Sequence, residues 1–400
     1  MAWFLLTLSF LFFLSLMILI SVVEASGEAG RKLAKKGISV LAALILASLV
    51  GVSMTMGGEP QTDKLCEISC QESNDYYRMA AAKNIAYRLD DSLIKKVEEA
   101  SRNNEKARDS LTVISKSLED IYKNADDAKR EKAMKCMEYA PREGLDDFLM
   151  EVVTKDPSRK VRAAAAVALK KVGDESCAEP LVQALLEEQE ENEFTEAIIG
   201  CLDAFGNARA AQMLVDELRK LDDTKDAARV EVLKKAIAAV GEPSAPLLLD
   251  FLGGPRTATA ESILTQIGRP ALKYLAAHID IHKDNQAVRG AACIPLFEIH
   301  LDEGGDVLAH MVNYLKRRDW NGAVKHVSVH YKTFIELGIR GSEYYLIDAL
   351  NAYGNVSMGE DYLNCGCDLL DQAARAWGSR HGYVVITGSG VYTGPGWGSR

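Results

Sequence analysis

The sequence predicts an all-α protein, an α-solenoid of stacked helix pairs preceded by one or two transmembrane helices and a helical hairpin. Two uncharged apolar runs at the N-terminus predict the membrane segments. Beyond them, apolar residues recur three or four positions apart, and an apolar–glycine step returns roughly every 25 to 35 residues. Hydrophobic residues make up 48% of the chain and prolines number only 10, which is typical of a folded helical protein.

The N-terminal segment, residues 1–56, is predicted to be a membrane anchor. Residues 2–23 and 37–56 carry no charge, and at about 1.5 Å per residue each run is close to the length that crosses a hydrocarbon core of about 30 Å. The connecting loop is mainly basic, and basic loops stay in the cytoplasm. Its basic residues are Arg31, Lys32, Lys35 and Lys36. A transmembrane hairpin would therefore place everything after Met56 on the extracytoplasmic side, periplasmic or extracellular.

Two other interpretations of this segment remain open. The first run would be a signal peptide if cleavage followed Ala25, although it lacks a basic region before its apolar core. Alternatively, the second run with its preceding basic residues is the only anchor or signal, and the first run is a wrongly extended start or a further anchor. Every interpretation leaves the bulk of the chain outside the cytoplasm.

Residues 57–73 are expected to be a linker, since they open with Gly and Pro in a polar stretch. A helical hairpin or spacer is predicted over residues 74–129. One helix covers about 74–100 and a second follows the polar residues 101–104, with a coiled-coil-like seam of alternating four- and three-residue steps. The apolar positions of that seam are Ala107, Leu111, Ile114, Leu118 and Ile121.

Internal repeats begin near residue 130, and the clearest unit spans residues 156–188. Asp156 and Pro157 are predicted to open a helix, the first as its N-cap and the second in its first turn. The buried face of that helix should include Val161, Ala165 and Ala168. Weaker copies of the same pattern follow at residues 192–221, 226–252, 257–279, 286–315 and 320–350.

This pattern resembles the HEAT repeats, particularly the short bacterial type named after phycobilisome lyases. The D-P-x-x-x-V-R-x-x-A-A-x-A-L signature is nearly intact over residues 156–169, and the resemblance extends over about residues 130–378. It implies a solenoid with a C-terminal cap over residues 130–383 and says little about activity. Residues 384–400 form a Gly-rich tail, in which Tyr392 and Trp397 are candidates for docking a partner.

The charge balance argues against nucleic acid as a partner. The chain has a net charge of -10, and without residues 1–56, which hold four basic and two acidic residues, 43 basic and 55 acidic residues remain, a net charge of -12. Two acidic clusters fall at junctions between repeats, where a solenoid presents one rim, and they are candidates for binding a cationic partner. Their residues are Glu187, Glu188, Glu190, Glu191, Asp222 and Asp223.

Two histidine pairs have the i, i+4 spacing that places both imidazoles on one helix face. They are His278 with His282, and His326 with His330. Neither pair forms the H-E-x-x-H motif of zinc proteases, and no His-Glu dipeptide of the kind that binds iron in deoxyhypusine hydroxylase occurs. We therefore assign no catalytic residue, no metal and no cofactor from the sequence, and keep the four histidines as metal-ligand candidates.

The cysteines near the two ends of the helical region are candidates for disulfides outside the cytoplasm. Cys66 and Cys70 lie four residues apart, and Cys365 and Cys367 lie two residues apart. Sequence alone does not decide their connectivity.

The leading functional hypothesis is a membrane-tethered scaffold, or an accessory subunit of an envelope complex, that binds a protein partner along the solenoid surface. The alternative is an enzyme of the HEAT-like lyase type, or a metal-binding protein that uses the paired histidines. A stoichiometric transition metal that disappears in His278→Ala or His326→Ala would favour the alternative.

Overall fold

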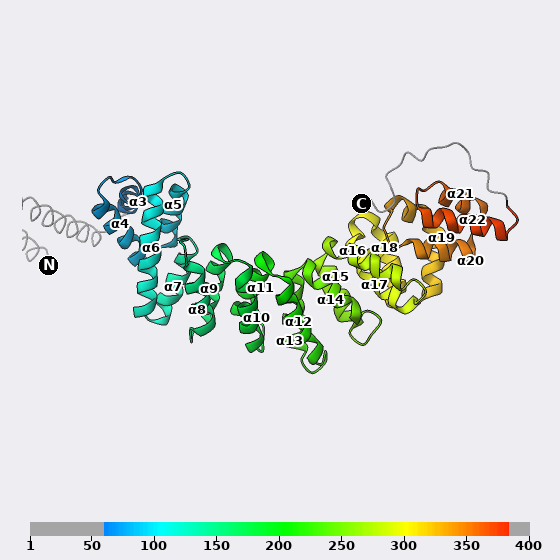
Figure 1. Cartoon of the computed structure of the whole chain (residues 1–400), viewed down its shortest axis with the longest axis horizontal. Helices are drawn as coiled ribbons and strands as arrows, with labels where there is room; N and C mark the ends of the chain where they lie inside the picture. Colours follow the sequence, from blue (N-terminus) through cyan, green and yellow to red (C-terminus); the bar gives the residue numbers. More distant parts are fainter. Residues whose placement is uncertain (1–59, 384–400) are drawn as a thin grey trace, which may run out of the picture. The chain divides into compact units, whose positions relative to one another are not determined.

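The computed structural model describes residues 60–383, which are helical with no strand (Figure 1). The two apolar runs predicted to be transmembrane, and the tail with Tyr392 and Trp397, lie outside the described residues. Within residues 60–383 no helix combines the length and the apolar character that crossing a membrane requires. The chain divides into two compact units, one ending at Gly144 and the other beginning at Leu145.

The first unit is a bundle in which α3 packs against α4, α5 and α6. Its longest helix, α6, buries Leu111, Ile114 and Leu118, as the predicted seam requires. The helices of this unit are α3 (Pro60–Gln71), α4 (Asp75–Arg88), α5 (Asp91–Ser101), α6 (Glu105–Asn124) and α7 (Asp127–Met137).

Three features of this unit differ from the sequence-based expectation. The segment expected to be a linker contains α3. The single helix expected over residues 74–100 is broken at Leu89, which has a left-handed backbone (φ 51°), and Asp90 then caps α5 by accepting a hydrogen bond from the Ser92 amide. Finally, α7 lies in this unit, whereas the solenoid was expected to begin at residue 130. The spacer is therefore a multi-helix bundle with its own buried core.

The second unit contains the remaining helices, which follow one another in chain order (Figure 1). They are α8 (Leu145–Lys155), α9 (Arg159–Val172), η1 (Glu175–Cys177), α10 (Ala178–Glu187), α11 (Glu193–Phe205), α12 (Ala208–Lys220), α13 (Ala227–Val240), η2 (Glu242–Ser244), α14 (Ala245–Leu248), η3 (Leu249–Phe251), α15 (Thr257–Ile267), η4 (Arg269–Ala271), α16 (Leu272–Ile281), α17 (Gln286–Ile299), α18 (Leu301–Lys316), α19 (Trp320–Leu337), α20 (Glu343–Tyr353), α21 (Val356–Leu363) and α22 (Asp368–Arg380).

Two layers of helices make up most of this unit, as expected for an α-solenoid. In the first layer, α9, α11, α13, α15 and α17 each pack against the next. In the second layer, α8 packs against α10, α10 against α12 and α12 against α14, while η3 packs against α16. Each helix therefore buries one stripe against its pair partner and its flanks against the neighbouring repeats.

The clearest predicted repeat is confirmed except for its first residues. Val161, Ala165 and Ala168 are buried on α9. The helix begins at Arg159, two residues after the predicted start, because the Asp156 carboxylate accepts a hydrogen bond from the Ser158 amide (2.8 Å) and forms a turn before the helix.

The predicted repeats over residues 286–315 and 320–350 form helix pairs, α17 with α18 and α19 with α20, but the two-layer order of contacts does not continue beyond α17. Gly305 breaks α18 with φ 50°, and α18 packs against both α17 and α19. The start of α20 reaches α16, where the Tyr344 hydroxyl donates a hydrogen bond to Asp280 (2.9 Å). The array then ends in α21 and α22, where Leu370, Ala374 and Trp377 form the buried face of the predicted cap.

Candidate functional site

Four arginines on the first layer and its loops bind carbonyl and carboxylate oxygens of other segments, and we call them the arginine ladder. They are Arg162, Arg229, Arg256 and Arg289. Arg162, for example, donates to the Asp156 carbonyl (3.0 Å) and to the Glu188 carboxylate (2.7 Å). Arg289 donates to the Lys283 carbonyl (3.0 Å) and to Asp348 (2.5 Å). The ladder therefore ties successive helices together with charge-assisted hydrogen bonds.

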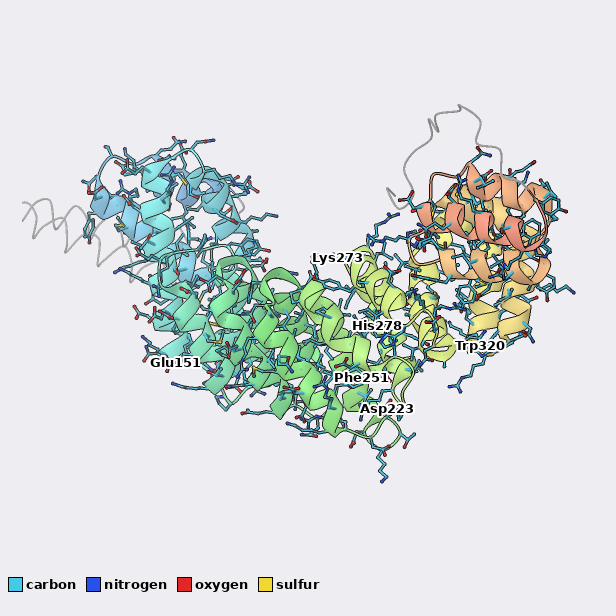
Figure 2. All side chains as sticks on the ribbon, turned by 45° about the vertical axis from the view of Figure 1, so that its right-hand side comes forward. Glu151, Asp223, Phe251, Lys273, His278 and Trp320 are labelled. Carbon is cyan, nitrogen blue, oxygen red and sulfur yellow. The ribbon has the colours of Figure 1, made fainter. Side chains whose placement is uncertain are left out.

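This ladder uses acidic residues that the sequence suggested for partner binding. Glu188 pairs with both Arg159 (3.1 Å) and Arg162. Asp223, labelled in Figure 2, pairs with Arg256 (3.0 Å) and accepts a hydrogen bond from Thr259 (2.9 Å).

The remaining acidic candidates divide into paired and exposed residues. Glu191 pairs with Lys235, and Asp222 accepts hydrogen bonds from the amides of Thr224 and Lys225 in its own turn. The exposed members left without such a role are Glu187 and Glu190.

The rings of each histidine pair lie close together, although His282 is the residue after α16 and His330 lies at a kink in α19. The ring centroids of His278 and His282 are 4.4 Å apart, and those of His326 and His330 are 4.7 Å apart. Burial lowers the pKa of both His278 and His326. In the part of the chain that the structure describes, however, no three His, Cys, Asp or Glu side chains come together as a metal site requires.

The cysteines proposed to form disulfides are buried thiols in this structure. Cys66 and Cys70 lie on α3, where the Cys66 thiol points at the Leu93 carbonyl (3.7 Å). Cys365 donates to the Tyr362 carbonyl (3.1 Å). Burial raises the pKa of Cys70 and of Cys367 to about 11, so neither is a reactive thiolate near neutral pH. Their pairing outside the cytoplasm stays a prediction.

A concave feature of the second unit lies between two successive first-layer helices, and we call it the α15–α17 groove. Its volume is about 700 Å³. One wall is the face of α15 around Ala258, Glu261 and Thr265, and the opposite wall is the face of α17 around Ala287 and Ala291. The loop at Gly253–Pro255, the end of α18 and the Trp320 ring also line it. A volume of this size suits a ligand side chain with part of its backbone.

Small residues create this hollow. Alanines at 258, 287 and 291 leave the space that larger side chains fill between most packed helices. Gly253 has φ 84°, and a side chain there would clash with Val288, since its Cβ would lie 2.6 Å from Cγ2 of Val288. Gly290 lets the Trp320 ring rest on α17, because a Cβ at this position would lie 2.3 Å from Cζ3 of the ring.

The two carboxylates in the groove differ in how many hydrogen bonds and ion pairs they make. Both oxygens of Glu298 are occupied, one by the Thr265 hydroxyl (2.7 Å) and the other by the Lys316 ammonium (2.6 Å). Glu261 lies on the opposite wall and is partly buried. Burial, together with the nearby Glu298 carboxylate, raises the pKa of Glu261 to about 7.

Sequence reasoning did not identify this groove. Its residues come from the loop before α15, from α15, α17 and the end of α18, and from the start of α19, so no single window of sequence contains the pattern. The available signal was the recurrence of alanine in the first helices of two successive predicted repeats. A glycine pair at Gly253–Gly254 before the first of them was a further sign of a close backbone approach.

Comparison with known proteins identifies the repeat type. A family model of HEAT repeats matches residues 115–201 and again residues 145–234. No curated protein matches the chain. The match agrees with the all-helical structure, and the matched residues include the layered helices α8 to α12. Residues 115–234 are therefore similar to HEAT repeats.

Proposed function

We propose that this chain is a membrane-tethered scaffold that binds a protein partner along its repeats, as an accessory subunit of an envelope complex. HEAT repeats commonly mediate protein–protein interaction, because stacked helix pairs expose a long continuous surface. The observation that carries the proposal is the α15–α17 groove, a hollow of about 700 Å³ between neighbouring repeats.

The membrane part of the proposal rests on the sequence. Residues 2–23 and 37–56 are uncharged, and the basic loop between them favours a cytoplasmic turn. The helical units would then face the periplasm or the cell exterior. A reporter fused after Met56 or at Arg400 should be active only outside the cytoplasm, and a reporter inserted between Arg31 and Lys36 should behave in the opposite way. Cytoplasmic activity at both of the first two positions would overturn this localisation.

Site-specific photo-crosslinking in intact cells tests the partner-binding part. A benzophenone amino acid at Gln266, an exposed residue that also lines the groove, should give one discrete adduct of the full-length chain. The same group at Thr224, exposed in the turn between α12 and α13, is the matched control and should give none. An absence of adducts at Gln266, or equal adducts at both positions, would contradict partner binding through this surface.

A further inference from the structure

Glu261 is an unusual carboxylate in the α15–α17 groove. Among the described residues, it makes no hydrogen bond and no ion pair, although it is partly buried on the wall of the cavity. Partly buried carboxylates are normally satisfied by donors or cations, because removing them from water is costly. An unsatisfied carboxylate that faces an open cavity therefore marks a position where a donor from another molecule would be stabilised.

The chain's own cations do not satisfy this carboxylate. Lys316, from the end of α18, is paired with Glu298. Arg318 follows in a turn with a left-handed backbone (φ 56°), where its side chain is exposed and forms no ion pair with Glu261. The charged groups around Glu261 are thus Glu298 from α17 and these two cations from the α18 end.

The rest of the groove suits the aliphatic part of a long cationic side chain. Ala258 and Ala287 are exposed on its two walls, and Ala291 is buried between them. Lysine and arginine place their methylene groups on such apolar surface while the charged end reaches a polar partner. The Trp320 indole completes the lining, and an indole face attracts ammonium and guanidinium groups.

We infer that the α15–α17 groove binds a basic segment of the protein partner, with one lysine or arginine side chain that lies along the alanines and Trp320 and pairs with Glu261. This inference rests on the proposed function and specifies the chemistry of the partner. The net charge of -12 for residues 57–400 favours a basic partner as well.

The protonation of Glu261 gives the interaction a pH dependence. Its pKa in the free protein is about 7, so near neutral pH a large fraction of the carboxyl is protonated and uncharged. A bound cation favours the charged form and lowers this pKa. Affinity for a basic segment should therefore increase as pH rises from about 6 to about 8, and it should level off once Glu261 is fully charged.

Peptide pools test the inference directly. The full-length chain in detergent is applied to immobilised pools of peptides of about eight residues, each pool having one central residue fixed and the others degenerate. The pools with Lys or Arg at the centre should bind most strongly. Equal binding of all pools would overturn the inference, and a preference for Asp or Glu would do so by assigning the groove to an acidic partner through Lys316 and Arg318.

Three variants test whether Glu261 and the α15–α17 groove are responsible for peptide binding. E261Q, which keeps the shape of the side chain, should weaken binding of the Lys and Arg pools about ten- to a hundredfold and abolish the pH dependence. E196Q, on the exposed surface of α11 and outside the groove, should leave both unchanged. A287L, at an exposed position, should weaken all pools by filling the groove. If E261Q binds the Lys and Arg pools as the unaltered chain does, the inference is wrong.

Photo-crosslinking separates this inference from the proposed function. Adducts at Gln266 that persist undiminished in E261Q would leave partner binding standing and overturn the role of Glu261. Adducts that disappear in E261Q but persist in E196Q would support the inference. A chain that gives no adducts at Gln266 even with Glu261 intact would contradict the proposed function, whatever the peptide pools show.

Discussion

The Arg289–Asp348 ion pair gives the sharpest test of how the second unit is held together. It joins α17 to α20, residues separated by two intervening helices, at an N–O distance of 2.5 Å. The Arg289 side chain is only 8% exposed, whereas that of Asp348 is 35% exposed. The guanidinium also lies over the Tyr345 ring, 4.6 Å from its centroid. Removing either partner should therefore have unequal consequences.

The magnitudes follow from this difference in exposure. Asp348→Ala leaves a buried guanidinium without its counter-ion, a loss that costs about 3–5 kcal/mol in a fully buried pair. Because a third of the Asp348 side chain is exposed, water partly replaces it, and we expect a cost near the low end, about 3 kcal/mol. Arg289→Met leaves an aspartate that remains hydrated, and the methionine side chain keeps apolar contact with Tyr345. The loss of unfolding free energy should therefore be about 1 kcal/mol.

Hydrogen exchange and urea unfolding of the full-length chain in detergent measure both effects. Asp348→Ala should lose amide protection in α17 and α20, while α9 and α10 keep theirs because repeats contact mainly their neighbours. The double variant should cost about as much as Arg289→Met alone, since the methionine no longer needs a counter-ion. If Arg289→Met is as destabilising as Asp348→Ala, the reasoning from unequal burial is refuted.

Three further predictions concern other parts of the second unit. Ala165→Leu, at a fully buried position on α9, should overpack the contact between helices and lower the free energy of unfolding by about 1–3 kcal/mol in urea titrations. The solvent-edge variant Lys170→Ala should change the free energy of unfolding by about 0.5 kcal/mol or less. Glu188→Ala should cost more than Glu187→Ala in the same titrations, because it leaves Arg159 and the ladder residue Arg162 without their carboxylate; equal costs would contradict the ladder. Burial and the neighbouring histidines lower the pKa of His326 in the folded chain, so the unfolded chain binds more protons. Stability should therefore fall as pH drops below about 6.5, and a thermal midpoint that rises on acidification, or the same pH profile in His326→Gln, would be the contrary result.

The fold class and the clearest repeat were readable from the chain because they depend on local regularities. The spacing of Val161, Ala165 and Ala168 identifies the buried face of α9 whatever the neighbouring helix is. Gly173 ends that helix as predicted, and the recurring apolar–glycine step indicates stacked pairs. The break at Leu89 was missed, since leucine carries no turn signal and only Asp90 after it favours a new helix start.

The roles of charged residues depended on tertiary packing. A run of glutamates has the same appearance in sequence whether it faces solvent or a neighbouring repeat, so Glu188 and Glu187 could not be distinguished before their distances to arginine were known. The same holds for Tyr344 and Asp280, whose hydrogen bond joins the start of α20 to α16 across a long stretch of sequence.

The α15–α17 groove is the clearest example of a feature that local sequence patterns do not reveal and that depends on tertiary packing. Its alanines, its glycines and Glu261 are all visible in the sequence, yet each is ordinary in its own helix. Periodicity reports which side of a helix is buried, because that depends on angles within one helix. It does not report which side chains of different helices meet, because that depends on how the helices pack across long sequence separations. Only the folded unit brings Glu261, Glu298 and Trp320 to one cavity, and leaves the first of them without a partner.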